Sequence, residues 1–492
     1  MKIYNYKWLL LLLVGVVTGC SSDDDSGTII VEPGEYTSGS ADFSHYVALG
    51  NSLTAGLTDG TLFLAGQQNS LPNILAEQFE LTGGGEFTQP LINDNIGGLL
   101  LGGNVIQEPR LFFNGSGPQR LTATPTTEIT STLSGPFNNM GVPGAKSFHL
   151  LAPGYGNVAG VATGQSNPYF VRFASSPATT VLADAVAQDP TFFSLWIGNN
   201  DVLSYATSGG VGVDQTGNFD PSTYGSNDIT DPNVFAQVYS TLLDALTANG
   251  ADGVVANIPN VTSLPYFTTV PRKPVPLDAT TAAALNNGYA QYNGGLQLAL
   301  ANNLINAEEA QARMISFAEG QNAVVIEDEN LTNLSALGIP SYRMVTDEDL
   351  IVLTAASFIG TTAGDNPQMI NGVSVPLADK WVLTKAEQEE VLQATAAYNQ
   401  TIESLAEAKG LAFVDVNSIL VQLADSEVAF DEYFLNSKLV FGGAFSLDGV
   451  HPTARGYAYL ANKFIAAINE TYNSNLPPVK AVDYNVIYPS SM

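Results

Sequence analysis

A serine and a histidine near opposite ends of the chain are the residues best suited to nucleophilic chemistry. Ser52 lies in a glycine-flanked segment from Gly50 to Gly56, and His451 follows Asp448 by three positions. A serine hydroxyl becomes a nucleophile when an imidazole takes its proton, and a carboxylate on the other ring nitrogen orients that imidazole. We therefore predict that Ser52 is a nucleophile, that His451 is its general base and that Asp448 orients the base.

Two further segments lie between these residues in the chain. The first runs from Asn139 to Ala145 and includes Gly144, and the second is Gly198-Asn199-Asn200-Asp201. Each segment alone is weak evidence, because short Gly-Asx-Ser or Asp-x-x-His sequences occur by chance in many proteins. The segments are a strong indication of an active site when they are taken together. They occur in this order, and each lies at the end of a predicted strand or before the last helix.

The four segments resemble the SGNH, or GDSL-type, family of esterases and lipases, which is named for its Ser, Gly, Asn and His. The resemblance extends from about Phe43 to the last helix and includes Asn257-Ile258-Pro259-Asn260. It implies an α/β fold, a flavodoxin-like three-layer sandwich with a five-stranded parallel sheet and large loop insertions. It also implies an oxyanion hole made by the backbone N–H groups of Ser52 and Gly144 and by the side-chain amide of Asn200.

One position departs from the family pattern, since residue 51 is Asn where the family usually has Asp. The two side chains have the same shape, so a carbonyl oxygen can still accept hydrogen bonds from the local backbone. We expect the turn to form and activity to persist without that negative charge.

Structural explanations of the same residues stay open at this point. Ser52 could be a turn residue, Asp448 could cap the final helix, and Gly144 and Asn200 could serve turns only. The other two histidines, His45 and His149, follow no motif with a carboxylate partner, so we interpret them as structural. The acidic residues at 347–349 are interpreted as a solvated turn, because no ligand spacing supports a bound cation.

Alternating strand and helix patterns support a mostly parallel sheet covered on both faces. Chemistry in such sheets collects at the carboxyl ends of the strands. The predicted strands are 46–50, 192–197, 254–258 and 411–416. The predicted helices are 70–79, 176–188, 235–246 with a stop at Gly250, a long helix opened by a Thr384–Glu387 capping box and ended by Gly410, and a final helix over 457–468.

The N-terminus is typical of an exported protein. Two lysines precede a short apolar run, and Val17-Thr18-Gly19-Cys20 resembles a bacterial lipoprotein processing site, with lipid attachment at Cys20. The acidic residues 23–25 resemble the surface-export sequence of Bacteroidetes-type lipoproteins, although a plain acidic tether would look the same. An ordinary signal peptide with an incidental cysteine is the alternative. We expect an outer-membrane lipoprotein exposed at the cell surface and attached to the membrane through Cys20.

Composition limits the classes of function. Loss of residues 1–19, which contain two lysines and no acid, changes the formal charge from −30 to −32. Such a charge disfavours nucleic acid as a partner. Cys20 is the only cysteine, which excludes an intramolecular disulfide and a thiolate metal cluster. The predicted ester hydrolysis needs no metal and no organic cofactor.

The predicted organisation is a signal peptide (1–19), an anchored tether (20–42), a hydrolase domain (43–473) and a C-terminal tail (474–492). Insertions near 57–137, 202–232 and 310–383 are expected to shape the pocket. The substrate is left open between lipid esters and acylated carbohydrates, and the oligomeric state is left open too. The alternative function is a non-catalytic surface glycan-binding lipoprotein on a hydrolase scaffold, but such a protein would be expected to have lost a reacting group.

Overall fold

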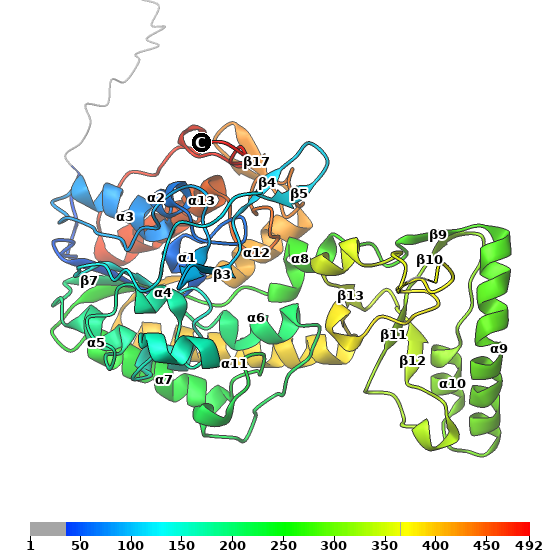
Figure 1. Ribbon diagram of the computed structural model, residues 1–492. Coiled ribbons are helices and arrows are strands. Elements are labelled where there is room, and N and C mark those ends of the chain that lie inside the picture. Colours follow the sequence, from blue (N-terminus) through cyan, green and yellow to red (C-terminus); the bar gives the residue numbers. More distant parts are fainter. Residues whose placement is uncertain (1–35, 365) are drawn as a thin grey trace, which may run out of the picture. The chain divides into compact units, whose positions relative to one another are not determined.

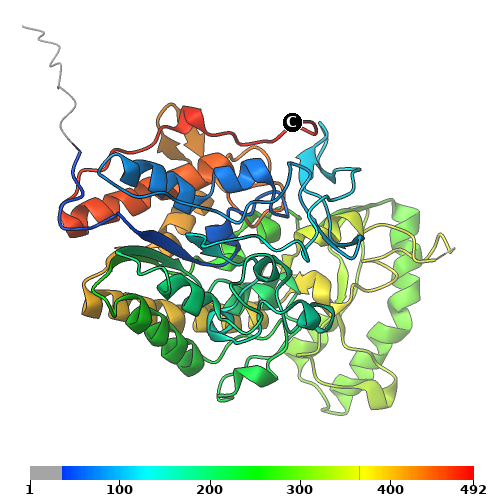
Figure 2. The same ribbon diagram turned by 60° about the vertical axis from the view of Figure 1, so that its left-hand side comes forward.

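The fold is described from a computed structural model of the chain, which describes residues 36–364 and 366–492 (Figures 1 and 2). The predicted signal peptide, Cys20 and the tether up to residue 35 lie outside the described residues. Among the helices that are described, none combines the length and the apolar composition needed to cross a bilayer.

A five-stranded, all-parallel sheet forms the centre of the fold. Every residue of β1 and β7 is buried, as expected for strands covered on both faces. Numbered by their order in the chain, the strands lie in the order 2-1-3-4-5, which is the flavodoxin-like order. The strands are β1 (Tyr46–Gly50), β6 (Asn139–Gly141), β7 (Phe192–Trp196), β8 (Asp252–Ala256) and β15 (Ala412–Val414).

Helices cover both faces of this sheet, which confirms the predicted three-layer sandwich (Figure 1). One face carries α3 (Leu71–Glu80) and α13 (Ala454–Tyr472), and the other carries α5 (Val181–Val186), α7 (Pro232–Leu246) and α11 (Lys385–Lys409). The buried stripe of α7 recurs every three to four residues, from Val234 to Leu246. Each such side chain contributes about 1.5–3 kcal/mol when it leaves water.

Helix ends follow local capping chemistry. The side chain of Ser70 accepts from Asn73 N–H before α3, and Gly410 ends α11 in the left-handed conformation, both as predicted. The helix predicted over 176–188 is shorter than expected. It begins only after Thr180, whose hydroxyl accepts from Ala183 N–H, and it ends at Val186, shortly before Asp189, which has a positive φ.

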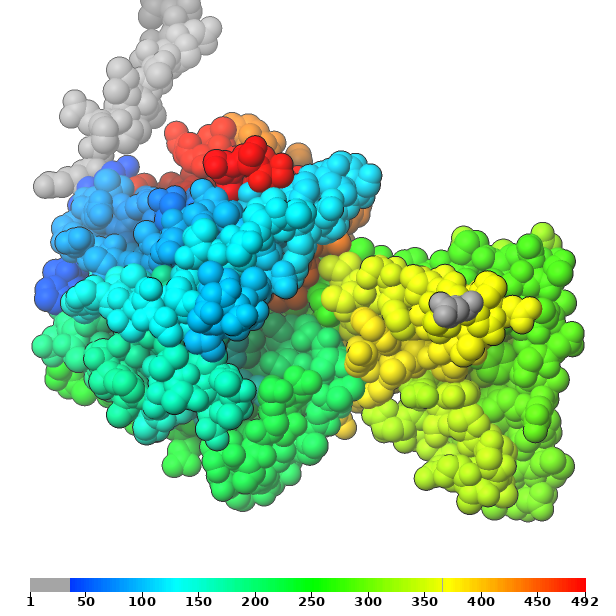
Figure 3. Space-filling model, viewed as in Figure 1, coloured from blue at the N-terminus to red at the C-terminus, as the bar shows by residue number. Residues whose placement is uncertain are grey.

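Two large segments lie outside the sandwich. The predicted insertion 57–137 includes α3, which belongs to the sandwich, and the rest of it contributes helix α2 and two short hairpins. Residues 275–383, here called the lobe, hold two helices and three two-stranded sheets beside the sandwich (Figures 1 and 3). The first segment contains α2 (Leu64–Gln68), β2 (Leu99–Leu101), β3 (Asn104–Gln107), β4 (Leu111–Phe113) and β5 (Pro118–Arg120). The lobe contains α9 (Ala279–Ala301), α10 (Ala307–Arg313), β9 (Val275–Leu277), β10 (Gly320–Asn322), β11 (Val325–Glu327), β12 (Tyr342–Met344), β13 (Leu350–Ile351) and β14 (Val382–Leu383).

The remaining short elements flank the carboxyl edge of the sheet or join its layers. They are α1 (Ser52–Ala55), α4 (Pro168–Val171), α6 (Asn200–Thr207), α8 (Pro265–Thr268), α12 (Val416–Asp425), β16 (Val428–Phe430) and β17 (Tyr433–Leu435). The C-terminal residues after α13 run back over the core, where the carbonyls of Tyr488 and Pro489 accept hydrogen bonds from the buried Arg110.

The expected solvated turn at 347–349 is wrong at one residue. Asp347 and Glu348 are exposed, but Asp349 is buried and binds the guanidinium of Arg343 through both carboxylate oxygens. The partner lies six positions away on β12, and the sequence around 347–349 gives no sign of it.

Candidate active site

Ser52 lies at the carboxyl end of the strand β1. The strand ends at Gly50, where an added Cβ would lie 2.1 Å from Thr54 Oγ1 and 2.3 Å from the Trp196 carbonyl oxygen. Only glycine therefore allows the chain to turn this tightly. Asn51 caps the helix that follows, because its Oδ1 accepts from Leu53 N–H at 3.0 Å. That bond confirms the prediction that the turn forms with Asn at position 51.

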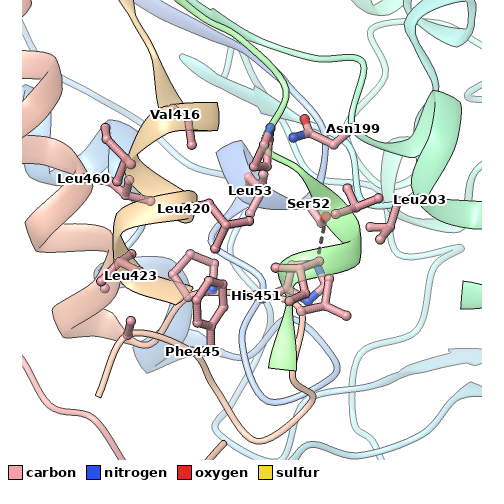
Figure 4. Close-up of a pocket in the computed structure, with 18 of the residues that line it drawn as sticks. Ser52, Leu53, Asn199, Leu203, Val416, Leu420, Leu423, Phe445, His451 and Leu460 are labelled. Atoms are coloured by element: carbon pink, nitrogen blue, oxygen red, sulfur yellow. Dashed lines mark hydrogen bonds between the residues drawn. The ribbon is translucent and has the colours of Figure 1, made fainter. Parts of the chain in front are cut away.

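His451 and Asp448 complete a chain of hydrogen bonds from the Ser52 hydroxyl. His451 Nε2 is 2.9 Å from Ser52 Oγ (Figure 4), and His451 Nδ1 is 2.9 Å from Asp448 Oδ2. An ionised carboxylate can only accept, so Nδ1 carries a proton and donates to Asp448. Nε2 of the neutral ring is then free to accept from the Ser52 hydroxyl.

The backbone around Asp448 holds its side chain in place. Oδ1 accepts from the N–H groups of Val450 and His451, and Oδ2 accepts from Gly60 N–H at 2.8 Å. Burial raises the pKa of Asp448, but His451 and these backbone donors outweigh it and hold the pKa at about 2. The carboxylate is therefore ionised throughout the range in which an imidazole works as a base.

Asp448 does not cap the final helix. The residue before α13 is Thr453, whose hydroxyl accepts from Gly456 N–H at 2.9 Å. This geometry removes the alternative explanation of Asp448 as the cap of that helix.

The two segments assigned to the oxyanion hole lie next to each other. Gly144 follows β6 with a φ of +80°, a conformation that a side chain strongly disfavours. Asn200 is the first residue of α6, and its Nδ2 donates one hydrogen to the carbonyl of Ala145 at 2.9 Å, which leaves its second hydrogen available. Asn200 also lines the same cavity as Ser52 and His451.

Asn199 is a site residue that the sequence analysis did not select. Its Oδ1 accepts from Asn51 Nδ2 at 2.9 Å, and its own Nδ2 is buried without a hydrogen-bond partner among the residues that the structure describes. Asn199 lies beside Ser52 at the cavity wall (Figure 4). The only sequence sign was its place between Gly198 and Asn200, which by itself indicates no particular role.

Asp59 is a second buried carboxyl near Asp448, and it was also missed. Its Oδ1 accepts from Leu447 N–H at 3.0 Å, and its backbone N–H donates to Ser446 Oγ at 3.0 Å. Burial raises the pKa of Asp59 to about 7, and the nearby Asp448 adds to the shift. Asp59 thus binds the segment before Asp448 while its other oxygen, Oδ2, has no donor within the described part of the chain.

A narrow apolar cavity opens beside Ser52 and His451. Its volume is ≈ 60 Å³, and it lies between α12, α13 and the segment that carries His451 (Figure 4). The wall includes Leu53, Leu203, Val416, Ile419, Leu420, Leu423, Phe445 and Leu460. No Lys, Arg, Asp or Glu side chain lines it, so the cavity suits an uncharged, apolar group.

The other two histidines lie outside this cavity. His45 is exposed at the start of β1. His149 is half-buried, its ring stacks on Tyr155 with centroids 4.7 Å apart, and its Nδ1 accepts from Lys146 N–H. Burial, with a contribution from Lys146, lowers the pKa of His149 to about 4, so this ring is neutral and has a packing role.

Comparisons with known proteins give little further information. No protein-family model and no curated protein matches the chain. A solved structure of the extracellular lipase from Streptomyces rimosus aligns with a TM-score of 0.28 and 11% sequence identity, covering 87% of this chain and 98% of the lipase. Because the TM-score is so low, this likeness carries no weight for function.

Proposed function

We propose that this protein is a serine ester hydrolase of the SGNH type. The observation that carries the proposal is the chain of two 2.9 Å hydrogen bonds from Ser52 through His451 to Asp448. These groups come from opposite ends of the sequence and meet at the carboxyl edge of a parallel sheet, where α/β proteins place their chemistry.

The geometry supports acyl transfer in two steps. Ser52 Oγ attacks the ester carbonyl carbon while its proton passes to His451 Nε2. The tetrahedral intermediate then collapses, its bond to the alcohol oxygen breaks, and His451 returns the proton to the leaving alcohol. Water, deprotonated by His451, attacks the acyl-enzyme and releases the acid, and the proton goes back to Ser52. Asp448 stabilises the imidazolium in both steps.

The intermediate carries a negative charge on the former carbonyl oxygen, and donors aimed at that oxygen lower the barrier. We assign this role to the backbone N–H groups of Ser52 and Gly144 and to Asn200 Nδ2. The left-handed backbone at Gly144 and the free second hydrogen of Asn200 support the assignment. One such donor is typically worth about 3–4 kcal/mol of transition-state stabilisation.

The cavity favours esters with an apolar acyl chain over acetyl esters. Its wall of leucines, valine and phenylalanine offers contact along a hydrocarbon chain and offers no partner for a charge. The alcohol part of the substrate, a lipid or a carbohydrate, is not selected by these residues.

The test is covalent labelling by a fluorophosphonate probe followed by peptide mass spectrometry. The expected result is one adduct on Ser52, together with hydrolysis of a 4-nitrophenyl ester. Ser52→Ala should lose both and keep its melting temperature, whereas Ser446→Ala, a buried serine of a neighbouring loop, should still be labelled at Ser52. Labelling of Ser52→Ala at the wild-type rate would refute the assignment. An unreactive wild-type protein that binds glycans would support the alternative of a non-catalytic binding protein.

We also propose that the mature protein is a cell-surface lipoprotein anchored through Cys20. The support is the sequence Val17-Thr18-Gly19-Cys20 and the acidic residues after it. Replacement of Cys20 by Ser should release a soluble, active protein into the periplasm or medium. A mature N-terminus that carries an unmodified Cys20, or that begins elsewhere, would exclude the anchor.

A further inference from the structure

Three carboxylates converge where the lobe meets the start of α11. Glu329 follows the strand β11, Asp379 begins the 3₁₀ turn Asp379–Trp381, and Glu387 lies in the first turn of α11. One oxygen from each of the three side chains lies within 4.8 Å of the corresponding oxygens of the other two. The three residues come from separate segments, so the fold brings their charges together.

No basic side chain neutralises this cluster. Among the residues that the structure describes, neither Glu329, Asp379 nor Glu387 forms an ion pair. A neighbouring acidic pair shows the contrast, because Asp328 and Asp349 both bind the guanidinium of Arg343. The guanidinium of Arg343 is therefore already occupied by other carboxylates.

Two buried oxygens in the cluster have no hydrogen-bond donor. Glu387 is only 2% exposed, and its Oε2 accepts from Thr384 N–H at 2.6 Å. Its other oxygen, Oε1, is buried without a partner within the described part of the chain, and so is Oδ1 of Asp379. Native proteins rarely leave buried polar atoms unsatisfied, so these two oxygens indicate a missing partner of positive charge.

A glycine-rich loop approaches the Glu387 carboxylate closely. A Cβ added to Gly210 would lie 2.2 Å from Cδ of Glu387, and one added to Gly209 would lie 2.7 Å from the carbonyl oxygen of Asp379. Both glycines have positive φ angles. The loop follows α6, the helix that begins at Asn200, so the acidic cluster contacts the segment directly after the helix that carries a proposed oxyanion donor.

The spacing suits a calcium ion. Ca²⁺ binds oxygen at about 2.3–2.6 Å, so one ion can contact oxygens up to about 5 Å apart, which includes the 4.8 Å of this cluster. A cavity of ≈ 500 Å³ borders Glu329, Asp379 and the glycine loop and leaves room for waters that complete the coordination. Mg²⁺ requires stricter octahedral geometry and gives up its waters reluctantly, so a site built from flexible carboxylates favours calcium.

We propose that Glu329, Asp379 and Glu387 together bind one Ca²⁺, which joins the lobe to α11 and to the loop after α6. The ion offsets two of the three negative charges and gives the two buried oxygens a positively charged partner. This site is separate from Ser52 and is a stabilising element, with no step of ester hydrolysis passing through it.

The direct test is isothermal titration calorimetry on the full mature chain after dialysis against a chelator. Titration with CaCl₂ should show one site, and MgCl₂ should bind at least tenfold more weakly. Calcium should also raise the melting temperature. Glu329→Gln, at an exposed residue whose change does not threaten folding, should weaken calcium binding at least tenfold. Glu387→Gln should do the same, and Glu403→Gln, at an exposed residue on the same helix, should bind calcium like the wild type.

The outcomes separate the site from its main competitor, in which the carboxyls hold protons. In the absence of a cation, burial raises the pKa of Glu387 to about 7, and burial with the facing Glu329 carboxyl raises that of Asp379 to about 8. No heat and no calcium-dependent rise in melting temperature at pH 8 would overturn the proposal. Calcium binding that Glu329→Gln and Glu387→Gln leave unchanged would overturn it as well, and equal affinity for magnesium would overturn the choice of calcium.

Discussion

Asn51 Nδ2 donates a hydrogen bond to Asn199 Oδ1 at 2.9 Å. Asn51 directly precedes the proposed nucleophile Ser52, and Asn199 directly precedes the helix α6, which begins with the proposed oxyanion donor. The bond fixes the orientation of the Asn199 amide, because Oδ1 must face Asn51. Nδ2 of Asn199 is thereby turned away from Asn51, and it is buried without a partner in the described part of the chain. The departure from Asp at position 51 is therefore matched by an acceptor at position 199.

Asn51→Asp should lower stability, although Asp is usual at this position in the SGNH proteins that the sequence resembles. Asn51 is fully buried, so the new carboxylate would lose its water, and it would face Asn199 Oδ1 unless that amide turns over to present Nδ2; the expected cost is about 1–3 kcal/mol. Urea unfolding should show this loss. Asn104→Asp, in an exposed hairpin, should leave stability unchanged. A wild-type unfolding free energy for Asn51→Asp would contradict the pairing.

Asn200→Ala should reduce kcat by about 10²–10³-fold with little change in KM, because it removes a donor used in the transition state. Asn199→Ala should mainly lower the melting temperature through loss of its bond to Asn51. Steady-state kinetics with a 4-nitrophenyl ester separates the two variants. If Asn199→Ala has the larger kcat defect, the oxyanion donor is Asn199 and the assignment to Asn200 is wrong.

Asp448→Asn should lower kcat by about 10³–10⁴-fold, since the amide no longer stabilises the imidazolium or selects its tautomer. The rate should stay low from pH 5 to 9, because the carboxylate with a pKa of about 2 is ionised over this whole range in the wild type. A melting curve of the variant shows whether a low rate results from unfolding instead. A rate near that of the wild type would show that Asp448 only organises its loop.

Asp59→Asn should change the pH dependence of stability. With a pKa raised from 3.8 to about 7 in the folded state, wild-type Asp59 holds a proton that the unfolded chain releases. The contribution of Asp59 to the free energy of unfolding is full below pH 3.8 and is lost as the pH rises through 7. The free energy that this contribution represents is on the order of 2–4 kcal/mol. Asn tolerates the positive φ of this position. The variant should therefore gain stability relative to the wild type between pH 5 and pH 8 in denaturant titrations, whereas Asp425→Asn, at an exposed position, should show no such gain.

Leu420→Phe should shorten the preferred acyl chain, because the larger ring fills a cavity of only ≈ 60 Å³. We expect the kcat/KM ratio of butanoyl to acetyl ester to fall at least tenfold. Val421→Phe is the matched control, since Val421 lies on the same helix and is 40% exposed. An unchanged ratio would place the acyl chain elsewhere.

The sequence allowed prediction of the elements whose pattern is local. The buried stripe of α7, the Gly410 stop and the strands that precede Ser52 and Asn200 depend on residues a few positions apart, so they could be recognised directly. Ser52, Asp448 and His451, which the structure joins by hydrogen bonds, could be selected because each lies in a short segment of unusual composition.

Contacts between distant segments could not be predicted in the same way. The Asn51–Asn199 bond, the approach of Asp59 to Leu447 and the convergence of Glu329, Asp379 and Glu387 each depend on how far-separated loops pack. Asp349 was misjudged for the same reason, since its charge is neutralised by a strand residue outside the turn. The start of α5 was misplaced, since the helix begins only after Thr180, whose side chain caps it.

The hydrogen bond between Ser52 and His451 joins positions 399 residues apart. While the chain is being made, the nucleophile segment is finished early, but its base arrives only with the last few dozen residues. A chain cut or stalled before residue 451 therefore has an unactivated serine, however well its early part has folded. Under the proposed mechanism, ester turnover begins only in molecules that include His451. The rate measured in a preparation is therefore proportional to the number of chains in which His451 has reached Ser52.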